Sequence, residues 1–110
     1  MRGVGVDIVE LRRIENIRHL DRFVQFILSE NEIRQMLSVS HRVQFVASRF
    51  AAKEAVIKAV PEVLTYLDFE IIKEDGKPVV RFLKPAMWRY RAFLSLAHST
   101  EYVVSFALVL

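Results

Sequence analysis

The stretch RFAAKEAVIKA, from Arg49 to Ala59, decides the predicted fold. It belongs to a run in which apolar residues recur at near-helical spacing, as is typical of a helix that packs on a core. Pro61 ends the helix, because proline disfavours the helical region for the residue before it. The sequence therefore predicts one long helix from about Arg42 to Val60. Its expected core-facing stripe consists of Val43, Val46, Ala47, Phe50 and Ile57.

Glu54 breaks the apolar pattern of this helix. It lies four residues after Phe50 and seven after Ala47, so it falls on or beside the stripe. A charge in that place is costly unless it is paired or bound to a metal. Lys58 follows four residues later and shares the same face. Two interpretations stay open: an ordinary Glu–Lys surface pair, worth about 0.3–0.5 kcal/mol, or a site that uses both charges.

Residues 3–9, GVGVDIV, are typical of a buried strand, because they are apolar, β-branched and too few for a helix. Strand alternation divides them into two faces: Val4, Val6 and Ile8 on one, and Gly3, Gly5, Asp7 and Val9 on the other. Close backbone packing explains the two glycines better than a phosphate-binding loop, which needs a third glycine and a lysine. Asp7 is either a turn residue at the strand end or an inward carboxylate.

Asp7 and Glu54 would form a metal site if the strand and the helix brought them together. Two convergent carboxylates with free coordination positions suit Mg²⁺, which completes its shell with water and substrate phosphates. A lysine such as Lys58 would pair with the remaining phosphate charge. His98 is a third candidate, because it lies in a predicted loop, where functional residues often occur. Its alternative is a structural or simply exposed histidine.

Two further helices are expected before the long one. Leu11–Leu28 carries an apolar stripe at near-helical spacing. Ser29 and Glu32 then form a capping box, which predicts a short helix over Glu30–Leu37.

After Pro61 the hydrophobic period changes to two, which indicates strands. They are expected at Phe69–Lys73, Val79–Lys84, Phe93–Leu96 and Tyr102–Leu110. Asp75-Gly76 is a turn signal, Lys77-Pro78 is expected to extend that loop, and Ala97–Thr100 forms the last loop. Between these strands, Pro85–Tyr90 suits a turn or a short helix. The order predicts an α+β fold, with a mainly antiparallel sheet packed on the long central helix.

Composition narrows the class of protein. The length of 110 residues suits a single domain over residues 1–110, and the absence of cysteine excludes disulfides and thiolate metal sites. No apolar run reaches the length of a membrane span, and the start of the chain is too acidic for a signal peptide, so we expect a cytoplasmic protein. A hydrophobic content of 53% fits a subunit interface or a well-filled core equally well.

The net charge of +3 fits an acidic partner or a phosphate-rich ligand. A nucleic-acid-binding module is the least favoured interpretation, because the chain offers no stacking platform or recognised motif for it.

Three segments together resemble the holo-[acyl-carrier-protein] synthase family, the small 4'-phosphopantetheinyl transferases. They are GVGVDIVELRRI (Gly3–Ile14) with a Gly-x-Asp element, RFAAKEAVIKA with the core Lys53, Glu54 and Lys58, and the hairpin LSLAHSTEYVVSFALVL with its loop histidine. DGKP at Asp75–Pro78 also has a counterpart. The resemblance implies an enzyme that transfers phosphopantetheine from coenzyme A to a serine of apo acyl carrier protein in fatty acid biosynthesis, releasing 3',5'-ADP.

The resemblance also implies roles for individual residues. Asp7 and Glu54 would hold Mg²⁺, Lys58 would neutralise the coenzyme A pyrophosphate, and Glu54 would help to deprotonate the serine through a metal-bound water. The implied coenzyme A contacts are Arg49, Lys58, Gly76, Lys77, Pro78, His98 and Ser99. Arg13, Arg18 and Arg22 would meet the acidic helix of the carrier. A homotrimer with active sites at the subunit interfaces is expected.

Two departures from the family pattern are visible. Val60-Pro61-Glu62 and a shortened loop replace a glycine-threonine-glycine turn, and Ala97 precedes His98 where a hydroxyl residue is common. An inactive domain that only binds carrier protein or nucleotide is therefore the alternative.

Overall fold

The computed structural model describes residues 1–110. Five strands, four α-helices and one 3₁₀ helix follow one another along the chain. In chain order they are β1 (Gly3–Glu10), α1 (Leu11–Glu15), α2 (Leu20–Ile27), α3 (Glu30–Leu37), α4 (Arg42–Ala59), β2 (Phe69–Glu74), β3 (Lys77–Phe82), η1 (Pro85–Met87), β4 (Ala92–His98) and β5 (Tyr102–Val109). The long helix, the capped helix α3 and the capping box of Ser29 and Glu32 agree with the sequence.

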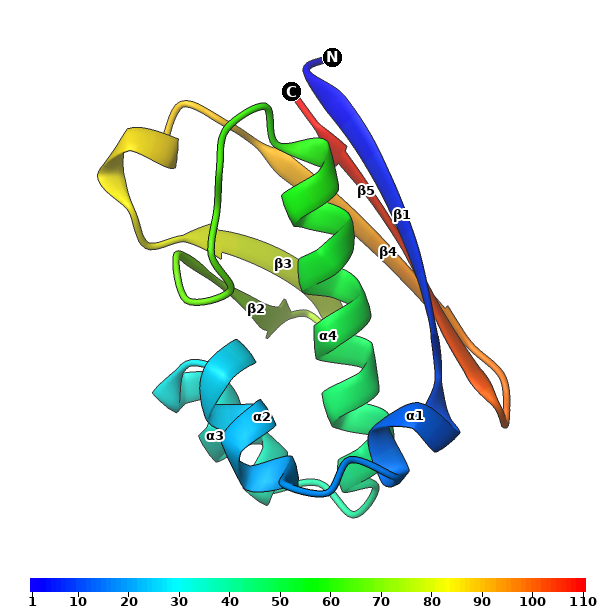
Figure 1. Ribbon diagram of the computed structural model, residues 1–110. Helices are drawn as coiled ribbons and strands as arrows, with labels where there is room; N and C mark the ends of the chain where they lie inside the picture. Colours follow the sequence, from blue (N-terminus) through cyan, green and yellow to red (C-terminus); the bar gives the residue numbers. More distant parts are fainter.

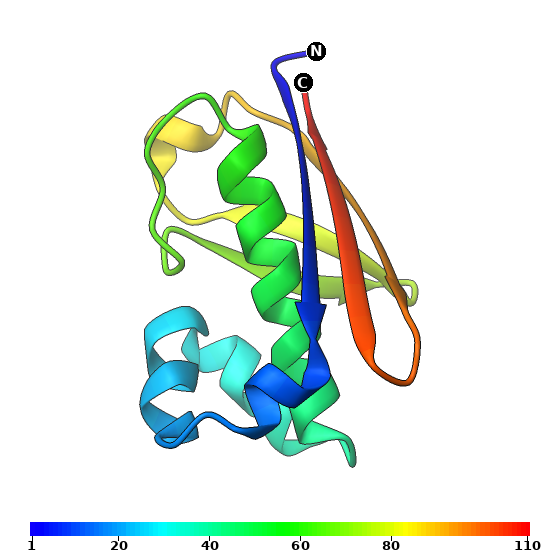
Figure 2. The same ribbon diagram turned by 45° about the vertical axis from the view of Figure 1, so that its right-hand side comes forward.

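The strands form two antiparallel sheets. β5 lies between β1 and β4 in a three-stranded sheet, and β2 pairs with β3 in a two-stranded one. The larger sheet runs along one side of α4, while α1, α2 and α3 gather at the N-terminal end of that helix (Figure 1, Figure 2). The two chain ends meet because the first and last strands pair, with Gly3 opposite Val109. The predicted α+β class is confirmed, and the sheet is divided in two.

Helix α4 is buried on more sides than the predicted stripe requires. Towards its C-terminus, Ala52, Ala55, Val56 and Ala59 pack in a core with β2, β3 and β5. Towards its N-terminus, Val46, Ala47 and Ala51 pack in a second core with α1, α2 and α3. The predicted apolar stripe is therefore narrower than the buried surface of α4, because the alanines bury a second face of the helix.

Gly3 and Gly5 allow β1 to lie directly against α4. A Cβ atom at Gly3 would lie 2.0 Å from the carbonyl oxygen of Ala59, and one at Gly5 would lie 2.0 Å from that of Ala55. Neither carbonyl is a mobile group, so no side chain fits at either position. The prediction of close backbone packing is confirmed.

One face of the three-stranded sheet is packed on α4 and the opposite face is exposed. The exposed face is apolar, as the alternation of β1 predicts. Its large exposed side chains are Val4, Val6, Ile8, Phe93, Tyr102, Val104 and Phe106.

The prediction of one helix over Leu11–Leu28 is wrong, because the chain turns at residues 16–19 between α1 and α2. Ile14 and Ile27 both belong to the core at the N-terminal end of α4. In one straight helix these two side chains would point roughly 140° apart at 100° per residue. The break lets both reach the same core.

Two loop boundaries also differ from the prediction. Asp75 (φ 51°) and Gly76 (φ 78°) alone close the turn between β2 and β3, so Lys77 and Pro78 belong to β3. Positive φ at both turn residues matches the twist of the strands and is typical of a two-residue Asp-Gly hairpin. His98 is the last residue of β4, opposite Val103, rather than a loop residue.

None of the helices is both long enough and apolar enough to cross a membrane.

Candidate active site

Asp7 lies in the middle of β1, opposite Ser105 of β5. Its Oδ1 accepts a hydrogen bond from Nζ of Lys58 at 3.2 Å, and the same ammonium donates to the carbonyl oxygen of Val6 at 2.9 Å. The turn interpretation of Asp7 is therefore wrong. Lys58 is exposed, so this ion pair is worth at most about 1 kcal/mol of stability. The carboxylate and the ammonium remain accessible to a ligand.

The surface-pair interpretation requires an ion pair between Glu54 and Lys58, and Glu54 does not form one. Its Oε1 accepts a hydrogen bond from the hydroxyl of Tyr66, a residue of the loop between α4 and β2. Burial, followed by the hydrogen bond to Glu54 and its charge, raises the pKa of Tyr66 to about 12. The charge of Asp7 acts in the same direction. Both carboxylates therefore lie close enough to act on one phenol, which stays protonated at neutral pH.

The donor set around Tyr66 fits Mg²⁺ better than a softer metal. It consists of carboxylate oxygens, without cysteine or histidine, and hard cations prefer oxygen ligands. No group of three or more ligating side chains is present, so the protein would supply two carboxylates, Asp7 and Glu54. Mg²⁺ tolerates this because it keeps several waters and takes further oxygens from substrate phosphates.

Lys53, next to Glu54, points the other way and is fully buried. Its Nζ donates at 2.7 Å to Oε1 of Glu32 and also reaches the carbonyl oxygens of Ile27, Tyr66 and Phe69. Burial lowers the pKa of Lys53, and the charge of Glu32 opposes that shift. This ammonium joins α2, α3, α4 and the loop that carries Tyr66.

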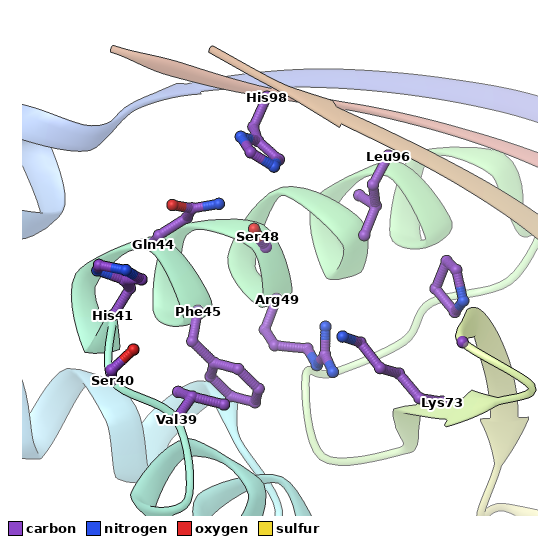
Figure 3. Close-up of a pocket in the computed structure, with 12 residues that line it drawn as sticks. Val39, Ser40, His41, Gln44, Phe45, Ser48, Arg49, Lys73, Leu96 and His98 are labelled. Carbon is purple, nitrogen blue, oxygen red and sulfur yellow. The ribbon is translucent and has the colours of Figure 1, made fainter. Parts of the chain in front are cut away.

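A pocket of about 390 Å³ opens over the N-terminal half of α4. Figure 3 shows the side chains of Arg49 and Lys73 extending toward each other, and His98 pointing from β4 toward Gln44 and Ser48. The other lining residues are Val39, Ser40, His41, Phe45, Gly76, Pro78 and Leu96. The pocket combines cations with apolar and aromatic walls.

Arg49 is the most informative residue of the pocket. It is only 3% exposed, it stacks over the ring of Phe45 at 4.5 Å, and it forms no ion pair with a carboxylate. Its Nη2 lies 3.4 Å from Oε1 of Gln35, and its buried Nε has no hydrogen-bond partner. Burial lowers its pKa, with the charge of Glu32 acting the other way. A buried guanidinium with free donors is suited to an anionic ligand such as a phosphate.

The residues predicted from sequence fall into three groups. Arg49, Gly76, Pro78 and His98 line the pocket, with Lys77 and Ser99 next to them in the chain. The second group, called the acidic group, consists of the carboxylates of Asp7 and Glu54, which both act on Tyr66, and of Lys58, which pairs with Asp7. No residue of that second group lines the pocket, and β5 separates the strand of Asp7 from the strand of His98.

Arg13, Arg18 and Arg22 form the third group, which is exposed on and between α1 and α2. Arg18 and Arg22 line one shallow hollow.

Sequence reasoning missed several pocket residues. His41, Gln44, Ser48 and Lys73 line the pocket but were given no role. The helical spacing of His41, Gln44 and Ser48 could have placed them on one face. Tyr66 was also missed, because a loop position carries no periodic signal.

The comparisons with known proteins agree with the family resemblance of the sequence. The ACPS sequence profile, described as the 4'-phosphopantetheinyl transferase superfamily, matches residues 3–107. A holo-[acyl-carrier-protein] synthase of Clostridium kluyveri is 37% identical over 97% of this chain and 88% of its own length. This chain belongs to the holo-[acyl-carrier-protein] synthase family of 4'-phosphopantetheinyl transferases. The prediction of the family and of its transferase activity is confirmed.

Solved structures of holo-[acyl-carrier-protein] synthases share the whole fold. The enzyme of Bacillus anthracis, solved in complex with CoA (3',5'-ADP), superposes with a TM-score of 0.85 at 37% identity, covering 98% of this chain and 95% of that one. The enzyme of Neisseria meningitidis gives 0.89 at 29% identity, covering 100% and 98%. The shortened loop at Val60-Pro61-Glu62 therefore leaves the family fold intact.

Proposed function

We propose that this chain, acting as one domain over residues 1–110, transfers the 4'-phosphopantetheine group of coenzyme A to a serine of apo acyl carrier protein. The reaction is Mg²⁺-dependent, releases 3',5'-ADP and serves fatty acid biosynthesis in the cytoplasm. The observation that carries this proposal is the meeting of β1 and α4, where Lys58 binds Asp7 and both Asp7 and Glu54 act on Tyr66.

The chemistry follows from these side chains. The serine oxygen attacks the phosphorus that carries pantetheine, a new P–O bond forms, and the P–O bond to 3',5'-ADP breaks. Glu54 takes the serine proton, and Lys58 neutralises charge on the pyrophosphate and on the leaving group. Mg²⁺, held by Asp7 and Glu54, would supply a Lewis acid for the phosphate oxygens. Phosphoryl transfer depends mainly on such positioning and charge neutralisation.

The nucleotide end of coenzyme A is assigned to the pocket over α4. Arg49 offers buried donors to a phosphate, and Phe45 offers an apolar wall. Gly76, Lys77 and Pro78 approach from the hairpin of β2 and β3, and His98 with Ser99 from the end of β4. A relative from Helicobacter pylori was solved in complex with coenzyme A and superposes with a TM-score of 0.83 at 26% identity.

The acyl carrier protein is assigned to α1 and α2. Arg13, Arg18 and Arg22 are exposed there, and positive side chains suit an acidic partner. Arg13 lies in α1, Arg22 lies in α2 and Arg18 lies between them, and these two helices gather at the N-terminal end of α4 (Figure 1).

We propose a homotrimer that forms through the exposed face of the three-stranded sheet. A contiguous apolar face of this kind is typical of a subunit interface. The pocket lies beside β4 at one edge of that sheet, and Asp7 lies in β1 at the other edge.

The experiment is to incubate the protein with coenzyme A, Mg²⁺ and several apo carrier proteins, and then to weigh the carriers. We expect the mass increase of one phosphopantetheine group. Glu54→Gln should lower the rate by about 10²- to 10⁴-fold, the usual contribution of a general base. Glu74→Gln, at the exposed end of β2, is the matched control and should leave the rate unchanged. Carrier binding without any mass increase would overturn the proposal and favour the inactive binding domain.

A further inference from the structure

Tyr66 contacts two neighbouring residues of α4 with its two polar ends. Its carbonyl oxygen accepts a hydrogen bond from Nζ of Lys53 at 2.7 Å, and its hydroxyl donates to Oε1 of Glu54. The two side chains of α4 point to different sides of the helix. Tyr66 therefore spans from the buried ammonium in the core to the carboxylate of the active site.

The backbone of Tyr66 is fixed on both sides. The backbone N–H of Thr65 donates to Oδ2 of Asp68 at 2.9 Å, and the N–H of Asp68 donates back to the carbonyl oxygen of Thr65 at 3.2 Å. Leu64, which precedes this turn, is buried in the core. Tyr66 thus sits in a closed four-residue turn at the end of the shortened loop that follows α4.

The ring of Tyr66 is fixed as well. Its centroid lies 6.1 Å from the ring of Phe50 in α4 and 5.5 Å from the ring of Phe26 in α2. Phe50 in turn packs edge-on against Phe23 at 5.1 Å. With backbone, ring and hydroxyl all held, the phenol presents its O–H to Glu54 in one direction.

We propose that Tyr66 is a positioning residue, whose hydroxyl holds the carboxylate of Glu54 in the orientation that binds the metal. The inference rests on the proposed function of Glu54. A carboxylate has about four lone-pair positions, so the single hydrogen bond at Oε1 leaves the others for a cation. Carboxylates that bind metals are commonly held in this way by a second group, and loss of that group typically costs about 10- to 100-fold in metal affinity or activity.

The phenol suits this role because its turn and its aromatic packing fix the direction in which its O–H points. A phenylalanine at the same position would keep the aromatic packing on Phe26 and Phe50 but would leave Glu54 free to rotate. Tyr66→Phe therefore separates the hydrogen bond from the packing.

The test is a titration of the protein with Mn²⁺ at fixed coenzyme A, followed by the electron paramagnetic resonance signal of free Mn²⁺. We expect Tyr66→Phe to weaken Mn²⁺ binding at least about 10-fold and to raise the Mg²⁺ concentration needed for half-maximal activity by a similar factor. Its KM for the carrier protein and its melting temperature should stay close to the wild-type values. Equal Mn²⁺ affinity of wild type and Tyr66→Phe would overturn the role of Tyr66.

Tyr90→Phe is the matched control, because the hydroxyl of Tyr90 also bonds a glutamate, Glu62, which lies beyond the end of α4. It should leave Mn²⁺ binding unchanged. Wild-type protein that transfers phosphopantetheine but binds no Mn²⁺ would overturn the metal site itself, an outcome distinct from failure of Tyr66 alone.

A double-mutant cycle covers the case in which Tyr66→Phe loses stability. In a Glu54→Gln background, Tyr66→Phe should change Mn²⁺ binding by less than about twofold, because the group that it orients is gone. Equal effects of Tyr66→Phe in both backgrounds would show that it acts through packing, and would contradict the proposal.

Discussion

Nζ of Lys53 lies 2.7 Å from Oε1 of Glu32, and both side chains are completely buried. Glu32 uses its other oxygen to accept the backbone N–H of Ile71 at 2.8 Å, and it also accepts the backbone N–H of Ser29. One ion pair thus ties the start of α3 and strand β2 to the middle of α4. Every polar atom of this buried pair has a partner.

We expect Lys53→Met to destabilise the protein by about 3–5 kcal/mol, because it leaves the charge of Glu32 buried and unpaired. Urea unfolding measures this change. Lys58→Met is the matched control on the same helix, and it should cost at most about 1 kcal/mol because Lys58 is exposed. A Lys53→Met protein as stable as the control would contradict the structural role of the pair.

The capping box illustrates how far the sequence predicts this region. The spacing of Ser29 and Glu32 is enough to place the start of α3, because both partners of a capping box are close in sequence. The second role of Glu32 could not be predicted, since Lys53 lies 21 residues away and Ile71 lies 39. Lys53 itself occurs in a recognisable motif, but no local pattern shows which way it points.

The active site could likewise be predicted only in part. The alternation of β1 correctly placed Asp7 on the face toward α4, and helical spacing correctly placed Glu54 beside the apolar stripe. The contacts of these two carboxylates could not be predicted in this way. The partner of Glu54 is a tyrosine in a loop, and Lys58 pairs with Asp7 and not with Glu54. Periodicity predicts faces, whereas contacts between distant segments depend on how the elements pack.

Gly5→Ala should disrupt the packing of β1 on α4. The added methyl group would lie 2.0 Å from the carbonyl oxygen of Ala55, so the strand or the helix must move. We expect a loss of about 1–3 kcal/mol, the usual cost of overpacking, with a fall in activity because Asp7 shifts with its strand. Thermal unfolding and the mass assay measure the two effects.

Val4→Ala, on the opposite face of β1, is the control and should change stability less. Full activity of a stable Gly5→Ala protein would contradict the close approach.

Glu70 makes stability depend on acid pH. Burial alone would raise the pKa of Glu70, but the hydrogen bonds from Ser29, Arg81 and Asn31 outweigh it and lower the pKa. A carboxylate with a lowered pKa stabilises the fold above its unfolded pKa, and that contribution is lost as the pH falls through the folded pKa. Melting temperatures should therefore fall steadily below about pH 4.5, its ordinary pKa.

Arg81→Met should make this fall shallower, because it removes the bond of 2.6 Å to Oε2 of Glu70. Arg12→Met, on the exposed side of α1, should leave the slope as in the wild type. Parallel slopes for all three proteins would rule out Glu70 as the group responsible.

Arg22→Glu should weaken the binding of the carrier protein and leave the binding of coenzyme A unchanged. Reversing an exposed charge that faces an acidic partner slows association and adds repulsion, so we expect the KM for the carrier to rise roughly tenfold. The KM for coenzyme A should not change, because Arg22 does not line the pocket over α4. Steady-state kinetics with each substrate varied separately distinguishes the two. Arg2→Glu, at the residue before β1, is the control for net charge.

Val6→Glu should dissociate the proposed homotrimer. Val6 is 58% exposed in the single chain and lies on the apolar face with Ile8, Val104 and Phe106. A charge there is harmless to the folded subunit, because the side chain points to solvent, but it is costly when buried against a second subunit. Sedimentation velocity should show a trimer for the wild type and a folded monomer for Val6→Glu, whose melting temperature falls only by the stabilisation that assembly contributes.

Val63→Glu places the same charge on another exposed valine, 90% exposed in the loop after α4, and should leave the trimer intact. If the active sites lie between subunits, the monomeric Val6→Glu protein should also lose transfer activity while Val63→Glu keeps it. A wild-type monomer would refute the assembly, and a trimeric Val6→Glu protein would move the interface away from this face of the sheet. Full activity in a monomeric Val6→Glu protein would place the complete site within one chain.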